Sequence, residues 1–276
     1  MTQDDHRRPP HHHHPEPPPV TPPVVTPPPV VTPPPVGPPV VPTPATYLFA
    51  DEFAGAAGTA PDPSKWAYDT GEGIWGTGEV ENMIESLETA YVDGAGHLVI
   101  ALVSDGSGGY LGARLTTQGK FSSQVGTAWE ASIKITPMAG AWPAFWLMGN
   151  NGNWPANGEV DVLENYGTAN NGESQTTVHS SGGNGQPSAY ANFAADSNFH
   201  IYRVEWTAGQ FEFFRDGVSY LTVTSAKLTP WPFEDNGGMY VILNVAAGGS
   251  GTNSVNPAAS ALPVKMTVDY VHCWEL

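Results

Sequence analysis

The chain has 276 residues, a formal net charge of −17 and only ten Lys and Arg residues. A nucleic acid would be repelled instead of releasing counterions, which excludes nucleic-acid binding and argues more weakly against sulfated polysaccharides. No stretch approaches the roughly 18 apolar residues of a membrane span, and the single cysteine, Cys273, excludes an intrachain disulfide framework and a cysteine-based metal cluster.

The amino-terminal segment, residues 1–46, consists mainly of Pro, Val, Thr and His and contains no aromatic ring of Phe, Tyr or Trp. We expect it to be a disordered tail or linker, extended in polyproline II conformation. Its histidine run, His11 to His14, is interpreted either as weak ligands of a divalent metal or as a solvated tail. No signal peptide is visible, because an apolar h-region is missing. Since Pro/Thr tracts are typical spacers, we still expect a secreted or cell-wall-associated protein.

Residues 47–276 are predicted to form one domain, which contains all nine Trp residues and is dominated by strand signals. Short β-branched or aromatic runs predict strands at His97–Val103, Ala128–Ile135, Phe199–Trp206, Gln210–Arg215 and Met239–Val245. Asp216-Gly217, between two apolar runs, indicates a hairpin turn, and residues 206–209 indicate another. The best helix candidates, 63–66 and 225–228, are single turns. Many strands without helices between them predict a β-sandwich or barrel, with Cys273 buried in its last strand.

One predicted strand carries a row of acidic residues, Glu159-Val160-Asp161-Val162-Leu163-Glu164. Because side chains alternate along a strand, Glu159 and Asp161 share a face and Val160 and Val162 point into the core. Strict alternation would bury Glu164, where an unpaired carboxylate is very unfavourable. A β-bulge at Val162-Leu163 returns Glu164 to the acidic face, so we predict that bulge.

Three carboxylates on one face suit the chemistry of glycoside hydrolysis. Glu159 and Glu164 can bring their carboxyl groups to the roughly 5–5.5 Å that a retaining mechanism requires, with Asp161 between them. The alternatives are a solvated acidic strand or a cation site, although a straight row of ligands converges poorly on one ion. Nearby rings at Trp142, Phe145, Trp146 and Trp154 offer flat apolar faces for a sugar ring or contribute to the core.

In order along the chain, several motifs make residues 47–276 resemble family 16 of the glycoside hydrolases, in its laminarinase-like group. They are Phe49-Ala-Asp-Glu-Phe53, Gly78-Glu-Val-Glu-Asn82, Gly112-Ala-Arg114-Leu, Trp142-Pro-Ala-Phe-Trp146-Leu, Gly158-Glu-Val-Asp-Val-Leu-Glu164, Phe199-His-Ile-Tyr202 with Glu205-Trp206, Leu243-Asn244-Val-Ala-Ala-Gly-Gly249 and Val268-Asp269-Tyr-Val271. The resemblance implies an all-β, concanavalin-like β-jelly-roll sandwich of two antiparallel sheets.

The resemblance also implies residue roles. Glu159 would be the nucleophile, Glu164 the general acid and then base, and Asp161 would assist the nucleophile. The residues expected to line the cleft are Asn82, Arg114, Trp142, Trp146 and His179. No cofactor is expected for catalysis, whereas a structural calcium ion would be held by Glu52, Gly96 and Asp269, partly through backbone oxygens.

Two departures from the family pattern bear on the substrate. Gly248-Gly-Ser-Gly-Thr-Asn-Ser254 lacks the usual Trp, and Glu79-Val80-Glu81 stands where Glu-x-Gln is common. The resemblance as a whole implies an endo-acting, retaining, monomeric β-1,3-glucanase that binds neutral polysaccharide, whereas these departures lie near substrate-contacting loops and keep other substrates open. Mixed-linkage β-1,3-1,4-glucan or a galactan is the alternative substrate. A lectin-like binding module and a structural cell-wall protein are the alternative functions.

Overall fold

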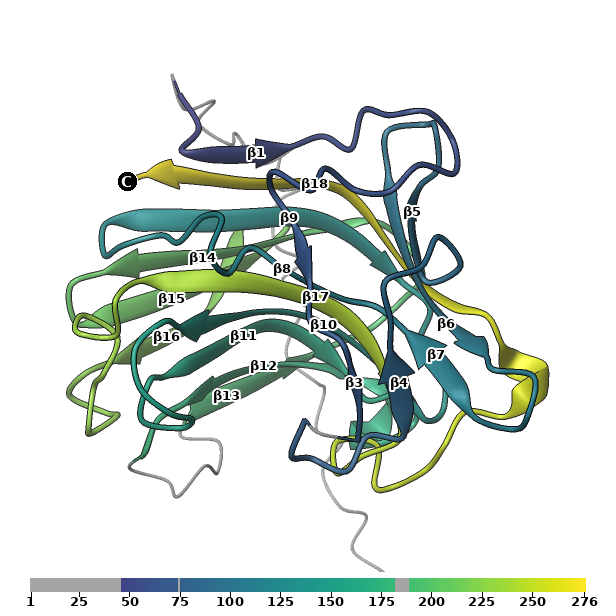
Figure 1. The fold of residues 1–276 in the computed structure, drawn as a ribbon. Helices are drawn as coiled ribbons and strands as arrows, with labels where there is room; N and C mark the ends of the chain where they lie inside the picture. Colours follow the sequence, from purple (N-terminus) through teal and green to yellow (C-terminus); the bar gives the residue numbers. More distant parts are fainter. Residues whose placement is uncertain (1–45, 74, 182–188) are drawn as a thin grey trace, which may run out of the picture. The chain divides into compact units, whose positions relative to one another are not determined.

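Two stacked β-sheets make up the part of the chain that the computed structural model describes, residues 46–73, 75–181 and 189–276 (Figure 1). The eleven-stranded sheet contains β1 (Phe49–Asp51), β3 (Gly71–Glu72), β4 (Glu81–Met83), β5 (Ala90–Val92), β6 (Leu98–Ser104), β7 (Tyr110–Gly112), β9 (Thr127–Ile135), β14 (His200–Thr207), β15 (Gln210–Arg215), β16 (Val218–Thr224) and β18 (Val264–Glu275). The seven-stranded sheet contains β2 (Ala67–Tyr68), β8 (Arg114–Thr116), β10 (Ala141–Gly149), β11 (Glu159–Asn165), β12 (Ser174–His179), β13 (Ala189–Phe193) and β17 (Met239–Ala247).

The strands predicted from the sequence are present within one or two residues of their expected ends. Both predicted hairpin turns are confirmed, and Asp216 and Gly217 have the positive φ angles of 51° and 77° that favour Asp-Gly at such a turn. The helix candidates at 63–66 and 225–228 are turns, and the helices among the described residues are the 3-10 segments η1 (Asn170–Gly172) and η3 (Ala259–Ala261). None of the described helices is long and apolar enough to cross a membrane.

The core lies between the sheets and follows the alternation of strand side chains. On β17, Leu243 and Val245 point into the core, while Asn244 and Ala246 line a pocket on the other face. Cys273 is buried in β18, as predicted. One feature differs from the expected antiparallel sheets, because β4 pairs with β7 in parallel. The Pro-rich segment and its histidine run lie outside the described residues, so their disorder stays a prediction.

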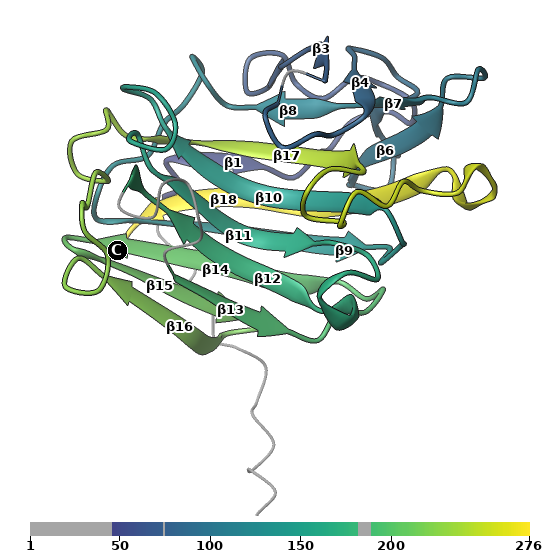
Figure 2. The same ribbon diagram turned by 90° about the horizontal axis from the view of Figure 1, so that it is seen from below.

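The outward face of the seven-stranded sheet forms the base of the site. Its strands follow the order β13-β12-β11-β10-β17-β8-β2, and Figure 2 looks onto this face. The long strands arch in the same direction, so that this face is concave (Figure 1). The acidic strand β11 lies near the middle, with neighbouring strands on both sides.

Candidate active site

The predicted bulge is present in β11. Against β10, Phe145 pairs with Leu163 while its neighbour Trp146 pairs with Asp161, so one residue of β11 has no partner. Against β12, the register shifts in the same place, between Asp161 and Glu164. As a result, Glu164 lies on the same face as Glu159 and Asp161, and all three line one pocket of about 300 Å³.

The three carboxylates differ in their surroundings. The side chain of Glu159 is 15% exposed, whereas that of Asp161 is 3% exposed. Glu164 is also buried and accepts hydrogen bonds from Trp142 Nε1 at 3.0 Å and from the hydroxyl of Tyr166 at 2.7 Å. Glu159 is therefore the acid with the more accessible carboxylate, and Glu164 is the one held by neutral donors.

His179 brings a nitrogen to the other two acids from the adjacent strand β12. Its Nε2 atom lies 3.1 Å from Asp161 Oδ2 and 3.7 Å from Glu159 Oε1. One possible metal-ligand atom from each of Glu159, Asp161 and His179 lies within 4.8 Å of the other two. No other group of three possible metal ligands occurs in the described part of the chain. The acids thus converge more than a straight row would, although no ion is needed to explain the arrangement.

Burial changes the acidity of all three carboxyl groups. It raises the pKa of Glu159 well above its usual range, and the nearby charge of Asp161 raises it further. Burial and the charge of Glu164 likewise raise the pKa of Asp161. Burial also raises the pKa of Glu164, against the opposing effect of its hydrogen bonds. Three coupled acids in one pocket retain a proton under conditions where an isolated carboxyl group has lost it, and acid catalysis requires such a proton.

The opposite end of the pocket is built around Arg114. Its guanidinium lies between two rings, 4.5 Å from the centroid of Trp75 and 4.6 Å from that of Trp146. Asp69 accepts a hydrogen bond from Arg114 Nε at 3.2 Å, and Trp146 Nε1 donates to Asn244 at 2.8 Å. The cation and the ring of Trp146 are therefore held in place before any ligand binds.

A short loop closes this end of the pocket and is attached to β17 through Glu81. Trp75, Thr77 and Glu79 line the pocket from this loop. The backbone N–H of Ala247 donates to Glu81 Oε2 at 2.7 Å, whereas Glu81 Oε1 is buried without a hydrogen-bond partner. Burial raises the pKa of Glu81 to about 7. A titratable group thus lies directly behind the loop.

The cleft residues expected from the resemblance are mostly brought together. Arg114, Trp142 and Trp146 line the pocket, and His179 contacts two of its acids. Asn82 is not among the residues that line this pocket, and in the sheet β4 pairs it with Glu72 and Leu111. A place for Asn82 elsewhere along the cleft stays a prediction. Phe145 belongs to the core, while Trp154 is 47% exposed at the pocket.

For several site residues, no role in the pocket was predicted from the sequence. Trp75 and Glu79 lie in or beside a Gly-rich loop with no periodic pattern, and Tyr166 follows the acidic strand in a turn. Asn244 was part of a quoted motif, but no role was assigned to it. A usable signal existed for Tyr166, since an aromatic hydroxyl two residues after a buried acid is well placed to donate to it.

The predicted calcium residues lie apart from this pocket. The backbone of Glu52 is beside Gly96, where an added Cβ would be 3.8 Å from the Glu52 carbonyl oxygen. The carboxylate of Glu52 instead contacts His272 at 2.5 Å. Asp269 occupies a bulge in β18, with Oδ1 4.0 Å from His97 Nε2. Backbone and carboxylate oxygens of this kind fit a hard cation, and calcium binding stays a prediction.

Comparison with known proteins gives consistent results. Residues 77–272 match the model of the family described as glycosyl hydrolases family 16. A beta-glucanase of Rhodothermus marinus is 32% identical over 249 residues, which cover 82% of this chain and 84% of that protein. Glucan endo-1,3-beta-glucosidase A1 of Niallia circulans is 30% identical over 83% of this chain, but only 37% of its own length is covered. The crystal structure of the laminarinase from Rhodothermus marinus superimposes with a TM-score of 0.73 at 30% identity, covering 83% of this chain and 96% of that one.

Proposed function

The chain belongs to family 16 of the glycosyl hydrolases, and from that starting point we propose that it is an endo-acting, retaining β-1,3-glucanase. The observation that carries the proposal is the bulged strand β11, which directs Glu159, Asp161 and Glu164 into one pocket. A lectin-like module on the same fold would use the aromatic rings but has no need for three coupled carboxylates.

In this mechanism, Glu159 attacks the anomeric carbon while Glu164 donates a proton to the departing glycosidic oxygen. The more accessible position of Glu159 fits a nucleophile. The hydrogen bonds from Trp142 and Tyr166 hold the carboxyl group of Glu164 in one orientation. Water then hydrolyses the glycosyl-enzyme intermediate after Glu164, now a base, removes its proton.

The reversal of the role of Glu164 follows from electrostatics. The charge of Glu164 raises the pKa of Glu159. Because the repulsion between two charges is mutual, the charge of Glu159 also raises the pKa of Glu164. Formation of the ester removes the charge of Glu159, so the pKa of Glu164 falls and it becomes the stronger acid that ends the first step deprotonated. Asp161 and His179 lie next to Glu159, where Asp161 raises the pKa of its carboxyl group and His179 lowers it.

The β-1,3 linkage is supported by the relatives. The Niallia circulans protein is named a glucan endo-1,3-beta-glucosidase, and the structural neighbour is a laminarinase. The rings of Trp142 and Trp146 provide apolar faces against a neutral sugar, with Arg114 and Asn244 available to its hydroxyl groups. A galactan or mixed-linkage glucan would use the same acids.

Release of reducing ends from laminarin tests the activity. We expect Glu159→Gln to lower kcat by roughly a thousandfold or more, while Glu88→Gln, on the exposed surface, serves as a charge-matched control. If Glu159→Gln retains wild-type turnover, the proposed nucleophile is wrong. Azide added to Glu159→Ala should restore turnover and give an α-glycosyl azide, and proton NMR of the wild-type reaction should show the β-anomer first.

A second experiment tests the substrate. Laminarin, lichenan and agarose are supplied in parallel, and products are separated by size. We expect short oligosaccharides of mixed length from laminarin, as an endo-acting enzyme gives. Faster cleavage of lichenan or agarose would leave the catalytic machinery intact and overturn the β-1,3-glucan assignment.

A further inference from the structure

The concave face continues beyond the pocket described above. That pocket lies on β8, β17, β10 and β11, whereas β12 and β13 extend the same sheet on the other side of the acids (Figure 2). Asp161 pairs with Thr177 of β12, and Thr177 pairs with Tyr190 of β13. Because directly paired residues of antiparallel strands share a face, Tyr190 faces the same side as Asp161, about 10 Å away across two strand spacings.

Tyr190 exposes its ring on that face. It is 60% exposed, the largest exposed fraction among the large hydrophobic side chains of the described residues. Beside it, Gln175 Nε2 donates to Asn192 Oδ1 at 2.9 Å, and Gln175 pairs with Glu164 in the sheet. An accessible ring next to a pair of amides matches a pyranose, which has an apolar face and hydroxyl groups at its edge.

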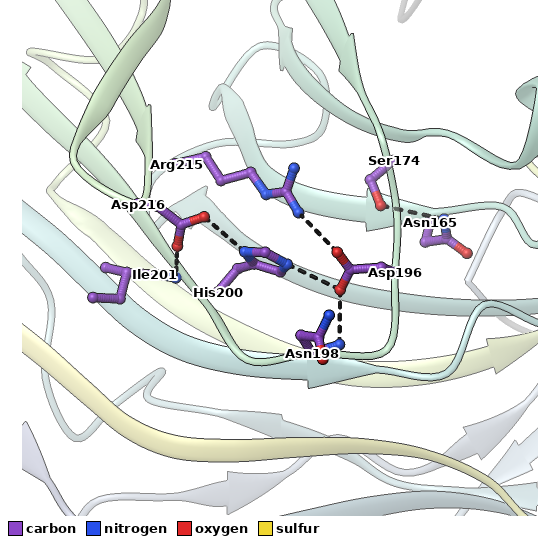
Figure 3. A network of polar contacts seen from close by, with 8 residues as sticks. All are labelled: Asn165, Ser174, Asp196, Asn198, His200, Ile201, Arg215 and Asp216. Carbon is purple, nitrogen blue, oxygen red and sulfur yellow. Dashed lines mark hydrogen bonds and ion pairs between the residues drawn. The ribbon is translucent and has the colours of Figure 1, made fainter. Parts of the chain in front are cut away.

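The strand that carries Tyr190 is an edge strand, but it is firmly attached. The guanidinium of Arg215 lies 5.3 Å from the ring centroid of Phe193, the last residue of β13. Directly after β13, Asp196 contacts His200 Nε2 at 2.9 Å and Arg215 at 3.9 Å, and His200 Nδ1 contacts Asp216 at 2.7 Å (Figure 3). This network joins the segment after β13 to the β15–β16 turn. Because β13 is already held in place, binding of a ligand costs little conformational entropy for ordering this strand.

We propose that Tyr190 is a sugar-stacking platform for the leaving-group side of the polysaccharide. The proposal rests on the proposed function. In this arrangement the pocket around Arg114 would hold the sugars that become attached to Glu159, whereas the face over β12 and β13 would bind the sugars that depart. Stacking on Tyr190 would place the departing sugar so that its glycosidic oxygen lies within reach of Glu164.

Two substrates distinguish stacking of the departing sugar on Tyr190 from a general effect of this residue on activity. Laminarin places sugars on both sides of the cleaved bond, whereas an aryl β-glycoside of a laminari-oligosaccharide places only a phenol on the leaving side. For Tyr190→Ala we expect the ratio of kcat/KM for laminarin to that for the aryl glycoside to fall about tenfold, the value of one stacked ring. Tyr190→Phe keeps the ring and should keep the ratio within about twofold of the wild type.

An unchanged ratio for Tyr190→Ala would overturn the proposal, whether both substrates keep their wild-type kcat/KM or lose it by the same factor. Val218→Ala, another exposed position, controls for a general surface effect. If the wild type cleaves neither substrate, the proposed function fails, and laminarin affinity electrophoresis then tests the platform alone. Retardation should be weaker for Tyr190→Ala than for the wild type, and equal retardation would refute the binding role.

Discussion

Glu81 provides a direct test of the electrostatics behind the pocket. The side chain is fully buried in β4, with one oxygen accepting the N–H of Ala247 and the other lacking a partner. Burial raises its pKa from the ordinary value of 4.5 to about 7, with Glu79 raising it slightly and Arg114 opposing. Glu81→Gln keeps the shape and the acceptor oxygen but removes the titration.

The magnitude follows from the two pKa values. The carboxyl group of Glu81 holds its proton more tightly in the folded state than in the unfolded state. Its contribution to the free energy of unfolding is therefore fully present below pH 4.5 and is lost progressively as the pH rises to about 7. At about 1.4 kcal/mol per pH unit, the loss amounts to roughly 3 kcal/mol. The new amide N–H₂ of Gln also lacks a partner, which destabilises the variant by about 1–3 kcal/mol at every pH. Only the pH-dependent part is therefore diagnostic.

The assay is urea unfolding of the wild type and Glu81→Gln at pH values from 4.5 to 8.5. We expect the difference in free energy of unfolding to move by roughly 3 kcal/mol in favour of Glu81→Gln as pH rises to 7, and then to level off. Thermal unfolding should show a shift of roughly 6–12 °C in the difference between the two Tm values. Glu88→Gln, at an exposed position, should show no such trend. A difference that is constant across this range refutes the reasoning.

Three further predictions concern the pocket and its support. The hydroxyl of Tyr166 donates to Glu164 and thereby lowers the pKa of Glu164. Tyr166→Phe removes this hydroxyl, so the pKa of Glu164 should rise and the alkaline limb of the kcat/KM profile should move to higher pH. An unmoved limb would contradict this role. Arg114→Lys cannot stack between Trp75 and Trp146 and should raise KM for laminarin about tenfold, whereas Lys134→Arg serves as a conservative control. Gly149→Ala would place a Cβ 2.1 Å from the Asn157 carbonyl oxygen and should lower the free energy of unfolding by about 3 kcal/mol. Gly106→Ala, with open space around it, should cost about 1–2 kcal/mol from its positive φ alone.

The main features of the site could be predicted because they follow from strong local physics. Glu164 has no acceptable place in the core, so the acidic row of β11 required an irregularity at Val162-Leu163. The Asp216-Gly217 turn could be predicted for a similar reason, since few residue pairs adopt two successive positive φ angles.

Other features depend on contacts between segments far apart in the chain. The parallel pairing of β4 with β7 involves strands of three residues each, which are too short to show a periodic pattern. Trp75 and Glu79 lie in a loop that is joined to the segment just after β17 by the bridge between Glu79 and Gly248. No local signal in the sequence specifies such a connection.

The buried thiol of Cys273 makes the unmodified protein its own unfolding probe. It is the only cysteine in the chain, and it lies in β18 between Phe49 of β1 and Trp129 of β9. Burial raises the pKa of the thiol to about 12, so a thiol-reactive dye meets almost no thiolate in the folded state. Labelling therefore requires β1 to detach or the sheets to separate. The labelling rate therefore reports how often those openings occur, without engineered cysteines and without a substrate.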